Sequence, residues 1–554
     1  MRKKITTLTL SVIMLLSTIA PMSALEKLDR IQGKSNYEIA AKIADKRAYS
    51  SVVLVNMNRS TADGLSAAAL AGCKDGVILL TGRDDIPAET MKRLENVTNV
   101  YIIGQESAVS KAVEEKLAEN GKYVTRFGGL DRFETSYEVA KEVLKTEGSL
   151  DKIFIANGLK GEADIVSASP VSYRDTAPIL LTDGETLNDD LKEVANGASK
   201  RYIVGGTTVI KESVKKGLKE SDRISGDNRY ATNQKVVEKF YSNPKEFNIV
   251  GYTDYAIATI ASSISTEKPI ALVNETKDPL ILKNAQKMTA VGNISENDIA
   301  KAIGYSGGFN HFNYGWTKHS YIAHALGGID GKRYTNSLQA LEYNYKKGFR
   351  VFEVDLDLSS DGELIACHAF DKNALKELGL PEKYSTQKPT AAEFKNQKLC
   401  GKYNTMTFKD IVSYMEKHPD MYTVIDLKQA TNRRVREIYK KIVEDASPEV
   451  LERIIPQIYR EEVYNEIMKI YDFKSAAFTC YTMQTLNADQ ITNFCAMNGI
   501  KVLVIEGRFY ANSLMEKCRD KGIKLYMNTY NDQNEVNSFK KKGAQGFFTD
   551  FLTP

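Results

Sequence analysis

The stretch YIAHALGGIDGKRYTNSLQALEYNYKKGFRVFEVDLDLSSDGELIACHA, residues 321–369, decides the fold of the C-terminal part of the chain. Two short apolar runs, 321–323 and 351–352, each lead directly into polar residues. Between them, apolar residues recur at helical spacing from Asn336, which we expect to cap the helix, to the terminating Gly348. A strand with a polar end, a helix and a second such strand predict the first unit of a βα-barrel, whose catalytic groups lie at the strand ends.

Four side chains of this stretch have the chemistry of a hydrolytic site: His324, Glu353, Asp355 and His368. Strand alternation places Glu353 and Asp355 on one face, about 7 Å apart at a rise of ~3.3 Å per residue. Carboxylates at this spacing suit one hard cation, which prefers oxygen ligands. The alternative is structural histidines beside a salt-bridge network. The functional interpretation is favoured because all 5 histidines of the 554-residue chain follow residue 310.

The order and spacing of these motifs resemble the glycerophosphodiester phosphodiesterases, a family of barrels similar to phosphatidylinositol-specific phospholipase C. The matching segments are His324-Ala325-Leu326-Gly327, Thr335-Asn336-Ser337, Glu353-Val354-Asp355, Asp361-Gly362, His368-Ala369 and, on a later strand, Asp426-Leu427-Lys428. The resemblance implies a TIM-type βα-barrel over residues 319–554 that hydrolyses a glycerophosphodiester to an alcohol and glycerol 3-phosphate. It also implies specific roles: acid and base catalysis by His324 and His368, one divalent cation (Ca²⁺ or Mg²⁺) on Glu353, Asp355 and Asp426, and substrate contacts by Lys428 and Asn336.

Three positions depart from the family pattern. The family has Arg after the first His and Asp after the second, where this chain has Ala325 and Ala369. Asp426 stands where the family usually has a Glu. Because both histidines and all three carboxylates are present, we expect an active variant. Two alternatives remain: a wall-anchored binding protein with impaired catalysis, and a phospholipase C or D type of enzyme that acts on lipids.

Residues 1–24 have the pattern of a secretory signal peptide: the basic Arg2-Lys3-Lys4, an apolar run at 5–20 and the small-residue site Met22-Ser23-Ala24. The apolar run is shorter than the ~20 residues that span a bilayer. We therefore predict export, with no transmembrane segment after signal removal. The net charge of +4 gives no reason to expect nucleic acid as a partner. The 6 cysteines form no CxxC pair and are read as buried apolar residues.

Residues 28–303 contain three repeats that begin about 96 residues apart. Their first residues are Arg30-Ile31-Gln32-Gly33, Arg126-Phe127-Gly128-Gly129 and Arg223-Ile224-Ser225-Gly226. Each continues with an amphipathic helix, an apolar strand, a small-residue helix and further apolar strands. This alternation predicts a parallel sheet covered on both faces, one Rossmann-like α/β unit per repeat. We place the units at residues 28–122, 123–220 and 221–303, with a linker at 304–318.

The repeats resemble the type-2 cell-wall-binding modules of clostridial surface proteins, which occur in threes. The resemblance implies anchoring to an anionic wall polymer and a location at the cell wall of a Gram-positive bacterium. It assigns polymer contact to the segment Pro178-Ile179-Leu180-Leu181. The residues alone leave two roles open for Arg30, Arg126 and Arg223, namely contact with an anion or a structural ion pair.

Overall fold

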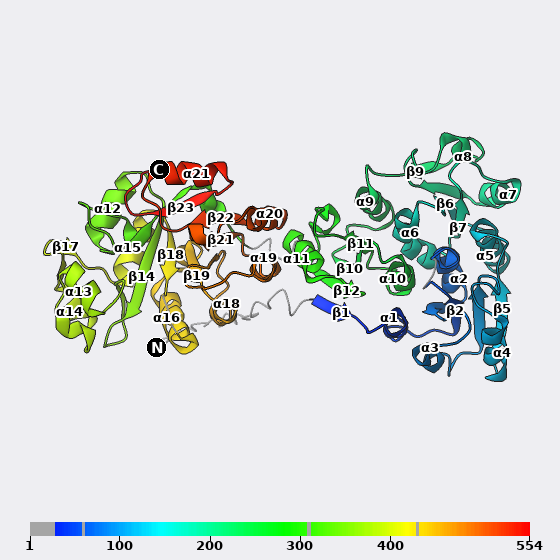
Figure 1. Cartoon of the computed structure of the whole chain (residues 1–554), viewed down its shortest axis with the longest axis horizontal. Helices are drawn as coiled ribbons and strands as arrows, with labels where there is room; N and C mark the ends of the chain where they lie inside the picture. The colour runs from blue at the N-terminus through cyan, green and yellow to red at the C-terminus, as the bar shows by residue number, and fades with distance from the viewer. Residues whose placement is uncertain (1–27, 58–60, 307–311, 428–430) are drawn as a thin grey trace, which may run out of the picture. The chain divides into compact units, whose positions relative to one another are not determined.

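The computed structural model describes residues 28–57, 61–306, 312–427 and 431–554 (Figure 1). The predicted signal peptide and Lys428 lie outside these residues. Within the described ranges, no helix is both long and apolar enough to cross a bilayer. Three four-stranded parallel sheets are followed along the chain by a closed βα-barrel, which confirms the predicted fold class.

The N-terminal part, residues 28–306, alternates short strands and helices. Its strands are β1 (Leu28–Ile31), β2 (Ser51–Val55), β3 (Gly76–Leu80), β4 (Asn99–Ile103), β5 (Tyr123–Phe127), β6 (Lys152–Asn157), β7 (Ile179–Thr182), β8 (Lys200–Val204), β9 (Asp222–Ile224), β10 (Glu246–Gly251), β11 (Ile270–Val273) and β12 (Lys287–Val291). Its helices are α1 (Asn36–Ala44), α2 (Ala67–Cys73), α3 (Ala88–Arg93), α4 (Lys111–Glu119), α5 (Arg132–Glu147), α6 (Glu162–Arg174), α7 (Asp189–Gly197), α8 (Glu212–Lys216), α9 (Arg229–Phe240), α10 (Tyr255–Ile260) and α11 (Glu296–Tyr305).

The three sheets and the three sequence repeats are offset by one strand. The first sheet has the order β3-β2-β4-β5, the second β7-β6-β8-β9 and the third β1-β12-β10-β11. The strand that begins each repeat therefore completes the sheet of another repeat. β5 pairs with β4, β9 pairs with β8, and β1 pairs with β12, so that the exchange forms a closed ring. The three modules consequently depend on one another for complete sheets.

The arginines that begin the repeats fix this exchange. Each pairs with a glutamate of the helix that follows the neighbouring strand: Arg30 with Glu296 at 2.6 Å, Arg126 with Glu114 at 2.8 Å and Arg223 with Glu212 at 2.9 Å. Arg126 and Arg223 also each donate to a backbone carbonyl at 2.8 Å, that of Gly104 and Gly205. Of the two roles left open by the sequence, the structure supports the structural ion pair.

A buried or partly buried carboxylate and a glycine recur together in every module. The pairs are Asp63 with Gly104, Asp164 with Gly205 and Asp254 with Gly292. Each glycine has a positive φ, between +97° and +127°, and a Cβ there would lie 2.8–3.2 Å from the carboxylate of its pair. Glycine is favoured at these positions because it adopts a positive φ without strain and has no Cβ to crowd the carboxylate. This gives a physical reason why the Asp and Gly pair recurs in the three modules. Burial raises the pKa of all three carboxyl groups, that of Asp164 to about 6.

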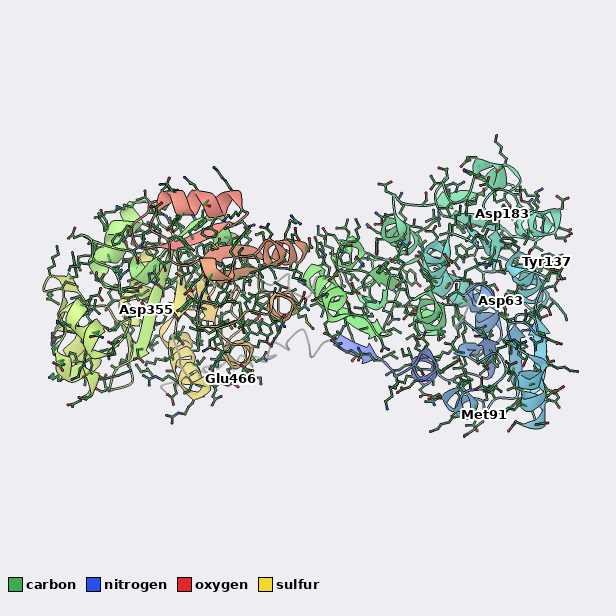
Figure 2. The ribbon with its side chains drawn as sticks, in the orientation of Figure 1. Asp63, Met91, Tyr137, Asp183, Asp355 and Glu466 are labelled. Atoms are coloured by element: carbon green, nitrogen blue, oxygen red, sulfur yellow. The ribbon has the colours of Figure 1, made fainter. Side chains whose placement is uncertain are left out.

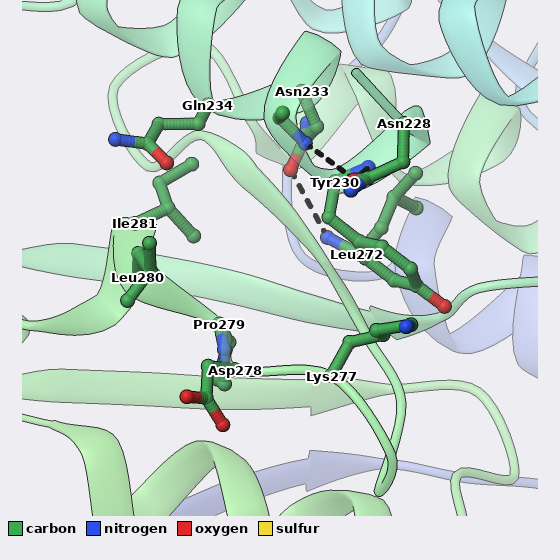
Figure 3. Close-up of a pocket in the computed structure, with 11 residues that line it drawn as sticks. Asn228, Tyr230, Asn233, Gln234, Leu272, Lys277, Asp278, Pro279, Leu280 and Ile281 are labelled. Carbon is green, nitrogen blue, oxygen red and sulfur yellow. Dashed lines mark hydrogen bonds between the residues drawn. The ribbon is translucent and has the colours of Figure 1, made fainter. Parts of the chain in front are cut away.

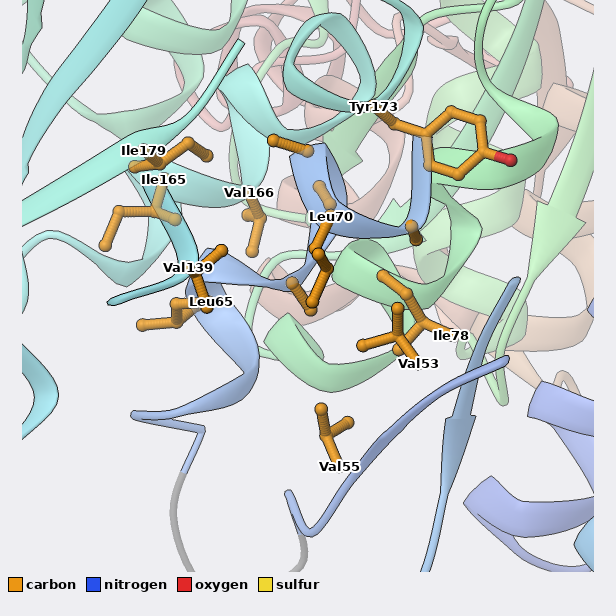
Figure 4. Close-up of a cluster of buried hydrophobic side chains, with 14 of the residues drawn as sticks. Val53, Val55, Leu65, Leu70, Ile78, Val139, Ile165, Val166, Tyr173 and Ile179 are labelled. Atoms are coloured by element: carbon orange, nitrogen blue, oxygen red, sulfur yellow. The ribbon is translucent and has the colours of Figure 1, made fainter. Parts of the chain in front are cut away.

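The core of the N-terminal part is continuous across the modules (Figure 4). Val53 and Ile78 of the first sheet, Leu70 of α2 and Val166 of α6 belong to one cluster of buried side chains. Small residues let α2 and α6 approach closely, since a Cβ on Gly72 would lie 2.0 Å from a backbone carbonyl oxygen of α6. The modules are thus joined by apolar packing as well as by strand exchange.

The C-terminal part, residues 312–554, contains the barrel. Its strands are β13 (Tyr321–Ala323), β14 (Val351–Leu358), β15 (Leu364–Ala366), β16 (Lys398–Leu399), β17 (Tyr403–Asn404), β18 (Tyr422–Asp426), β19 (Ile454–Ile458), β20 (Ala477–Thr479), β21 (Val502–Ile505), β22 (Lys524–Met527) and β23 (Gly546–Thr549). Its helices are α12 (Leu338–Lys346), α13 (Lys372–Leu378), α14 (Ala391–Lys395), α15 (Phe408–Lys417), α16 (Asn432–Asp445), α17 (Pro448–Leu451), α18 (Glu461–Met468), α19 (Ala488–Met497), α20 (Asn512–Asp520) and α21 (Gln533–Lys541).

The barrel closes through the pairing of β13 with both β14 and β23. The strand order is β13-β23-β22-β21-β20-β19-β18-β14-β15, in which β15 is a ninth strand outside the closed ring. β15 pairs antiparallel with the end of β14, so the two form a hairpin around the predicted Asp361-Gly362 turn. The Cys367 N–H donates to the Asp355 carbonyl oxygen at 3.0 Å, so this hairpin brings His368 back beside the carboxylate-bearing part of β14.

The helix after β13 begins one residue later than predicted. It begins at Leu338 and its N-cap is Ser337, whose hydroxyl accepts a hydrogen bond from the Ala340 amide. The prediction that Asn336 caps this helix was therefore wrong, because the left-handed backbone at Asn336, with φ of +45°, directs its side chain elsewhere. Trp316, in the predicted linker, is fully buried and packs edge-on against Tyr526 of β22 with ring centroids 5.6 Å apart.

Candidate active site

Three carboxylates converge inside the barrel at the carboxyl ends of two neighbouring strands. Glu353 and Asp355 belong to β14, and Asp426 is the last residue of β18. The parallel register pairs Asp355 directly with Asp426. Ligand oxygens of the three groups all lie within 4.8 Å of one another, and the three residues are at most 3% exposed. Figure 2 shows Asp355 in its place within the barrel.

The donor set fits a hard divalent cation. Burying three carboxylates this closely is costly unless positive charge compensates them. Carboxylate oxygens are the ligands that Ca²⁺ and Mg²⁺ prefer. The residues therefore match the predicted cofactor class, and they do not distinguish between the two ions.

Two of the carboxylates are oriented by groups from the segment after β13. The Asn336 amide donates to Asp355 Oδ2 at 2.9 Å, and the Asp355 backbone N–H donates to Asn336 Oδ1 at 3.2 Å. The Ala325 N–H donates to Glu353 Oε2 at 2.6 Å. This last contact uses a left-handed backbone, with φ of +50° at Ala325. Asn336, predicted to contact substrate, thus positions a candidate metal ligand, and its substrate contact stays a prediction.

The third carboxylate is oriented by a tyrosine that the sequence analysis missed. The Tyr459 hydroxyl donates to Asp426 Oδ1 at 2.6 Å, and the Gln457 amide donates to that hydroxyl at 3.1 Å. Gln457 lies near the end of β19, and Tyr459 directly follows that strand. The sequence does contain a signal for these two residues, since polar side chains at the end of a barrel strand are typical of an active site.

Replacing Tyr459 with phenylalanine should weaken divalent-cation binding by about 10-fold, the lower end of the range for groups that orient metal ligands. Tyr439 provides a matched control, because it is also buried near Asp426 but its hydroxyl has no hydrogen-bond partner among the described residues. Tyr439→Phe should leave the affinity for Ca²⁺ unchanged. Calorimetric titration with Ca²⁺ tests both variants, and equal affinities for the two would contradict the role of Tyr459.

Both predicted catalytic histidines lie at this end of the barrel. His324 follows β13 directly and is 6% exposed, with its Nε2 4.0 Å from Glu353 Oε2. His368 follows β15 and is partly exposed. The Tyr334 ring contacts both imidazoles, with centroid distances of 5.0 Å to His324 and 4.5 Å to His368. The structure therefore brings together two proton-transfer groups that are 44 residues apart in the sequence.

The predicted polymer-binding segment is buried. Pro178, Ile179, Leu180 and Leu181 are all buried side chains of the second sheet and the position before it. The Leu181 N–H donates to the Ser136 hydroxyl of α5 at 3.0 Å, so this part of the sheet edge is also covered. Direct contact between these four side chains and a polymer does not fit this fold, and a role of the segment in polymer binding stays a prediction.

A cavity of about 190 Å³ lies in the third module (Figure 3). One wall contains Asn228, the N-cap of α9, and Tyr230 of that helix. Another wall contains Lys277, from the segment after β11. In this module a short 3₁₀ turn at Leu280–Leu282 occupies the place that α3 and α7 take in the other two modules. The third module therefore offers a concave surface with a lysine and a tyrosine at its wall.

Comparison with known proteins follows the same division of the chain. Residues 30–114, 126–215 and 223–307 match the family model of cell wall binding domain 2, and residues 328–553 match that of the glycerophosphoryl diester phosphodiesterase family. Among curated proteins, the N-acetylmuramoyl-L-alanine amidase LytC of Bacillus subtilis is 29% identical over 295 residues, which cover 52% of this chain and 57% of LytC. The amidase enhancer of the same organism is 27% identical over 268 residues, 47% of this chain and 36% of the relative. The chain thus spans less than two thirds of either relative.

Solved structures also resemble parts of the chain. Cwp8 from Clostridium difficile has a TM-score of 0.46 and 29% identity, over 50% of this chain and 51% of Cwp8. A phosphodiesterase from Oleispira antarctica in complex with the product sn-glycerol-3-phosphate has a TM-score of 0.35 and 16% identity, over 42% of this chain and 93% of that one. The two family models show that the chain consists of three type-2 cell-wall-binding repeats followed by a domain of the glycerophosphoryl diester phosphodiesterase family.

Proposed function

We propose that the barrel is a divalent-cation-dependent phosphodiesterase that hydrolyses glycerophosphodiesters to an alcohol and glycerol 3-phosphate. The observation that carries the proposal is the convergence of three buried carboxylates with two histidines at the carboxyl ends of the barrel strands. The match of residues 328–553 to the glycerophosphoryl diester phosphodiesterase family supports the choice of substrate class.

The two histidines are the proton-transfer groups of the proposed reaction. One imidazole takes the proton from the attacking oxygen, which is water or a neighbouring glycerol hydroxyl, and the other gives a proton to the leaving alkoxide. Imidazole suits both tasks because its ordinary pKa lies near neutral pH. The T-shaped contact of Tyr334 with His324 and its tilted contact with His368 hold the two rings around one space.

The carboxylates Glu353, Asp355 and Asp426 would hold one Ca²⁺ or Mg²⁺ ion. When bound, such an ion stabilises the charge that develops on the phosphoryl oxygens. The hydrogen bonds from Asn336, Ala325 and Tyr459 keep the three carboxylates in place before substrate arrives. Ala325 thus contributes a backbone N–H at the position where the family has an arginine.

The N-terminal modules would anchor the enzyme at a Gram-positive cell wall after export. The three matches to cell wall binding domain 2 support attachment to an anionic wall polymer. The cavity of the third module, with Lys277 at its wall, is a candidate contact for such a polymer. Location at the wall makes two substrate pools accessible: soluble glycerophosphodiesters and glycerol phosphate polymers.

The purified protein should release glycerol 3-phosphate from glycerophosphocholine or glycerophosphoglycerol when Ca²⁺ or Mg²⁺ is present. A chelator should stop the release, and added metal should restore it, while circular dichroism stays unchanged. Absence of release from either diester by a folded protein would favour the alternative of a binding protein with impaired catalysis. Cleavage of phospholipid vesicles without diester hydrolysis would favour the phospholipase alternative.

A further inference from the structure

A tight turn carries Arg333 and Tyr334 back to the active site. Ile329 and Lys332 exchange two backbone hydrogen bonds of 2.9 and 2.8 Å, and the two residues between them, Asp330 and Gly331, have φ values of +49° and +72°. Two consecutive residues with positive φ form the turn that an Asp-Gly pair favours, because glycine has no Cβ to clash. The conformation of this segment is therefore determined by its own sequence.

Side chains on both sides of Arg333 and Tyr334 fix the segment in place. Before them, Asp330 Oδ2 accepts hydrogen bonds from Lys402 Nζ at 2.6 Å and from the Tyr403 hydroxyl at 2.7 Å. After them, Asn336 is bound to Asp355, one of the three candidate metal ligands. The short stretch between Asp330 and Asn336 therefore has little freedom to leave the mouth of the barrel.

The Arg333 side chain lies on the ring that touches both histidines. Its guanidinium carbon is 5.3 Å from the Tyr334 ring centroid, while the same ring contacts His324 and His368. Arg333 is exposed, so its five N–H donors remain accessible from solvent. Stacking on an aromatic ring orients a guanidinium without consuming those donors.

The charge balance of the site favours an additional cation such as Arg333. Three carboxylates and one divalent ion leave a net charge of −1, and a phosphodiester substrate brings a further −1 to the same space. With one imidazole protonated for its role as the acid, the total charge is still −1, so a further positive group would reduce the repulsion between substrate and site. A guanidinium meets a phosphate group with two parallel hydrogen bonds, which makes Arg333 suited to this task.

We propose that Arg333, seated on Tyr334, binds the phosphate group of the substrate and so determines selectivity for anionic diesters. Tyr334 acts as the positioning residue that holds the guanidinium beside the two histidines. This inference rests on the proposed diesterase function. Arg333 and Tyr334 lie outside the segments that match the family motifs.

The test compares Arg333→Ala with Lys332→Ala, which removes the adjacent exposed lysine of the same turn. Arg333→Ala should raise KM for glycerophosphoglycerol by about 10- to 100-fold, the usual effect of losing a charged hydrogen bond, with a smaller change in kcat. Arg333→Lys should restore part of the loss, since it keeps the charge but not the two-point contact. Lys332→Ala should behave as wild type.

Two further measurements separate this inference from a general loss of structure. The affinity for glycerol 3-phosphate, measured by calorimetry with Ca²⁺ present, should fall by the same factor in Arg333→Ala. In a double-mutant cycle, Tyr334→Ala should add little to the KM of Arg333→Ala, because the two residues act as one unit. A KM and a product affinity within twofold of wild type would overturn the inference. If wild type hydrolyses no diester, the proposed function fails, and the product affinity alone decides the role of Arg333.

Discussion

Replacing either His324 or His368 with alanine is expected to lower kcat for diester hydrolysis by about 10²- to 10⁴-fold, the usual contribution of a positioned acid or base. The loss should appear in kcat more than in KM, because proton transfer takes place in the transition state and not in substrate binding. Binding of Ca²⁺ should stay close to wild type, since neither imidazole belongs to the carboxylate cluster. Steady-state assays with calorimetric metal titrations measure these quantities.

His418 provides the matched control for the histidine variants. It ends α15 on the outside of this site, where its ring stacks on Tyr414 at 4.0 Å and its Nδ1 lies 2.7 Å from the Tyr414 carbonyl oxygen. His418→Ala should lower the melting temperature but leave kcat at 25 °C unchanged. If all three histidine variants lose activity equally, or if none does, acid and base catalysis by His324 and His368 is contradicted.

The barrel and its carboxylates could be predicted because their signals are local. Several barrel strands are short apolar runs that lead into a polar residue, as β13 leads into His324 and β18 ends in Asp426, so a strand and its functional residue can be predicted from the same few positions. Glu353 and Asp355 share a face by strand alternation alone. The sequence could not identify the roles of Tyr459 and Tyr334, because each depends on a partner that only the folded barrel brings close.

Asn336 illustrates how local reasoning fails at a functional position. Its sequence context is that of a helix cap, and the neighbouring Ser337 satisfies the same pattern. The left-handed backbone at Asn336 directs its side-chain amide away from the helix, and this amide donates a hydrogen bond to Asp355. Such backbone conformations are uncommon outside glycine and gather at functional sites, yet a single sequence does not show which residue adopts them.

The strand exchange in the N-terminal part also could not be predicted from the sequence. β1 pairs with β12, whose partner residues lie 260 positions later in the chain. An edge strand of four residues carries an alternation pattern but no information about which sheet it joins. The repeats are similar enough that each first strand could complete its own sheet or another one, and only packing of the whole set selects the ring.

The ring predicts that a change in the first repeat destabilises the third. Ile31 is 5% exposed at the end of β1, pairs with Val291, and accepts a hydrogen bond from the Gly292 N–H at 2.9 Å. Ile31→Ala should cost about 2–4 kcal/mol, because it leaves a cavity in a buried position. The loss should be localised in the third sheet, since that is the sheet that β1 completes.

Hydrogen exchange distinguishes the exchanged arrangement from a simple chain of three independent modules. In Ile31→Ala, the amides of β12 should lose protection while those of β2 and β4 keep it. Ile224 is the matched control, because it is also 5% exposed and occupies the same position in β9. Ile224→Ala should instead expose β8 of the second sheet, the strand with which β9 pairs. Loss of protection in β2 and β4 upon Ile31→Ala would mean that the first repeat completes its own sheet, and the ring would then be wrong. Loss confined to β12 would mean that the first strand of the chain completes the third sheet, so that damage in one repeat reaches the module whose sheet that strand completes.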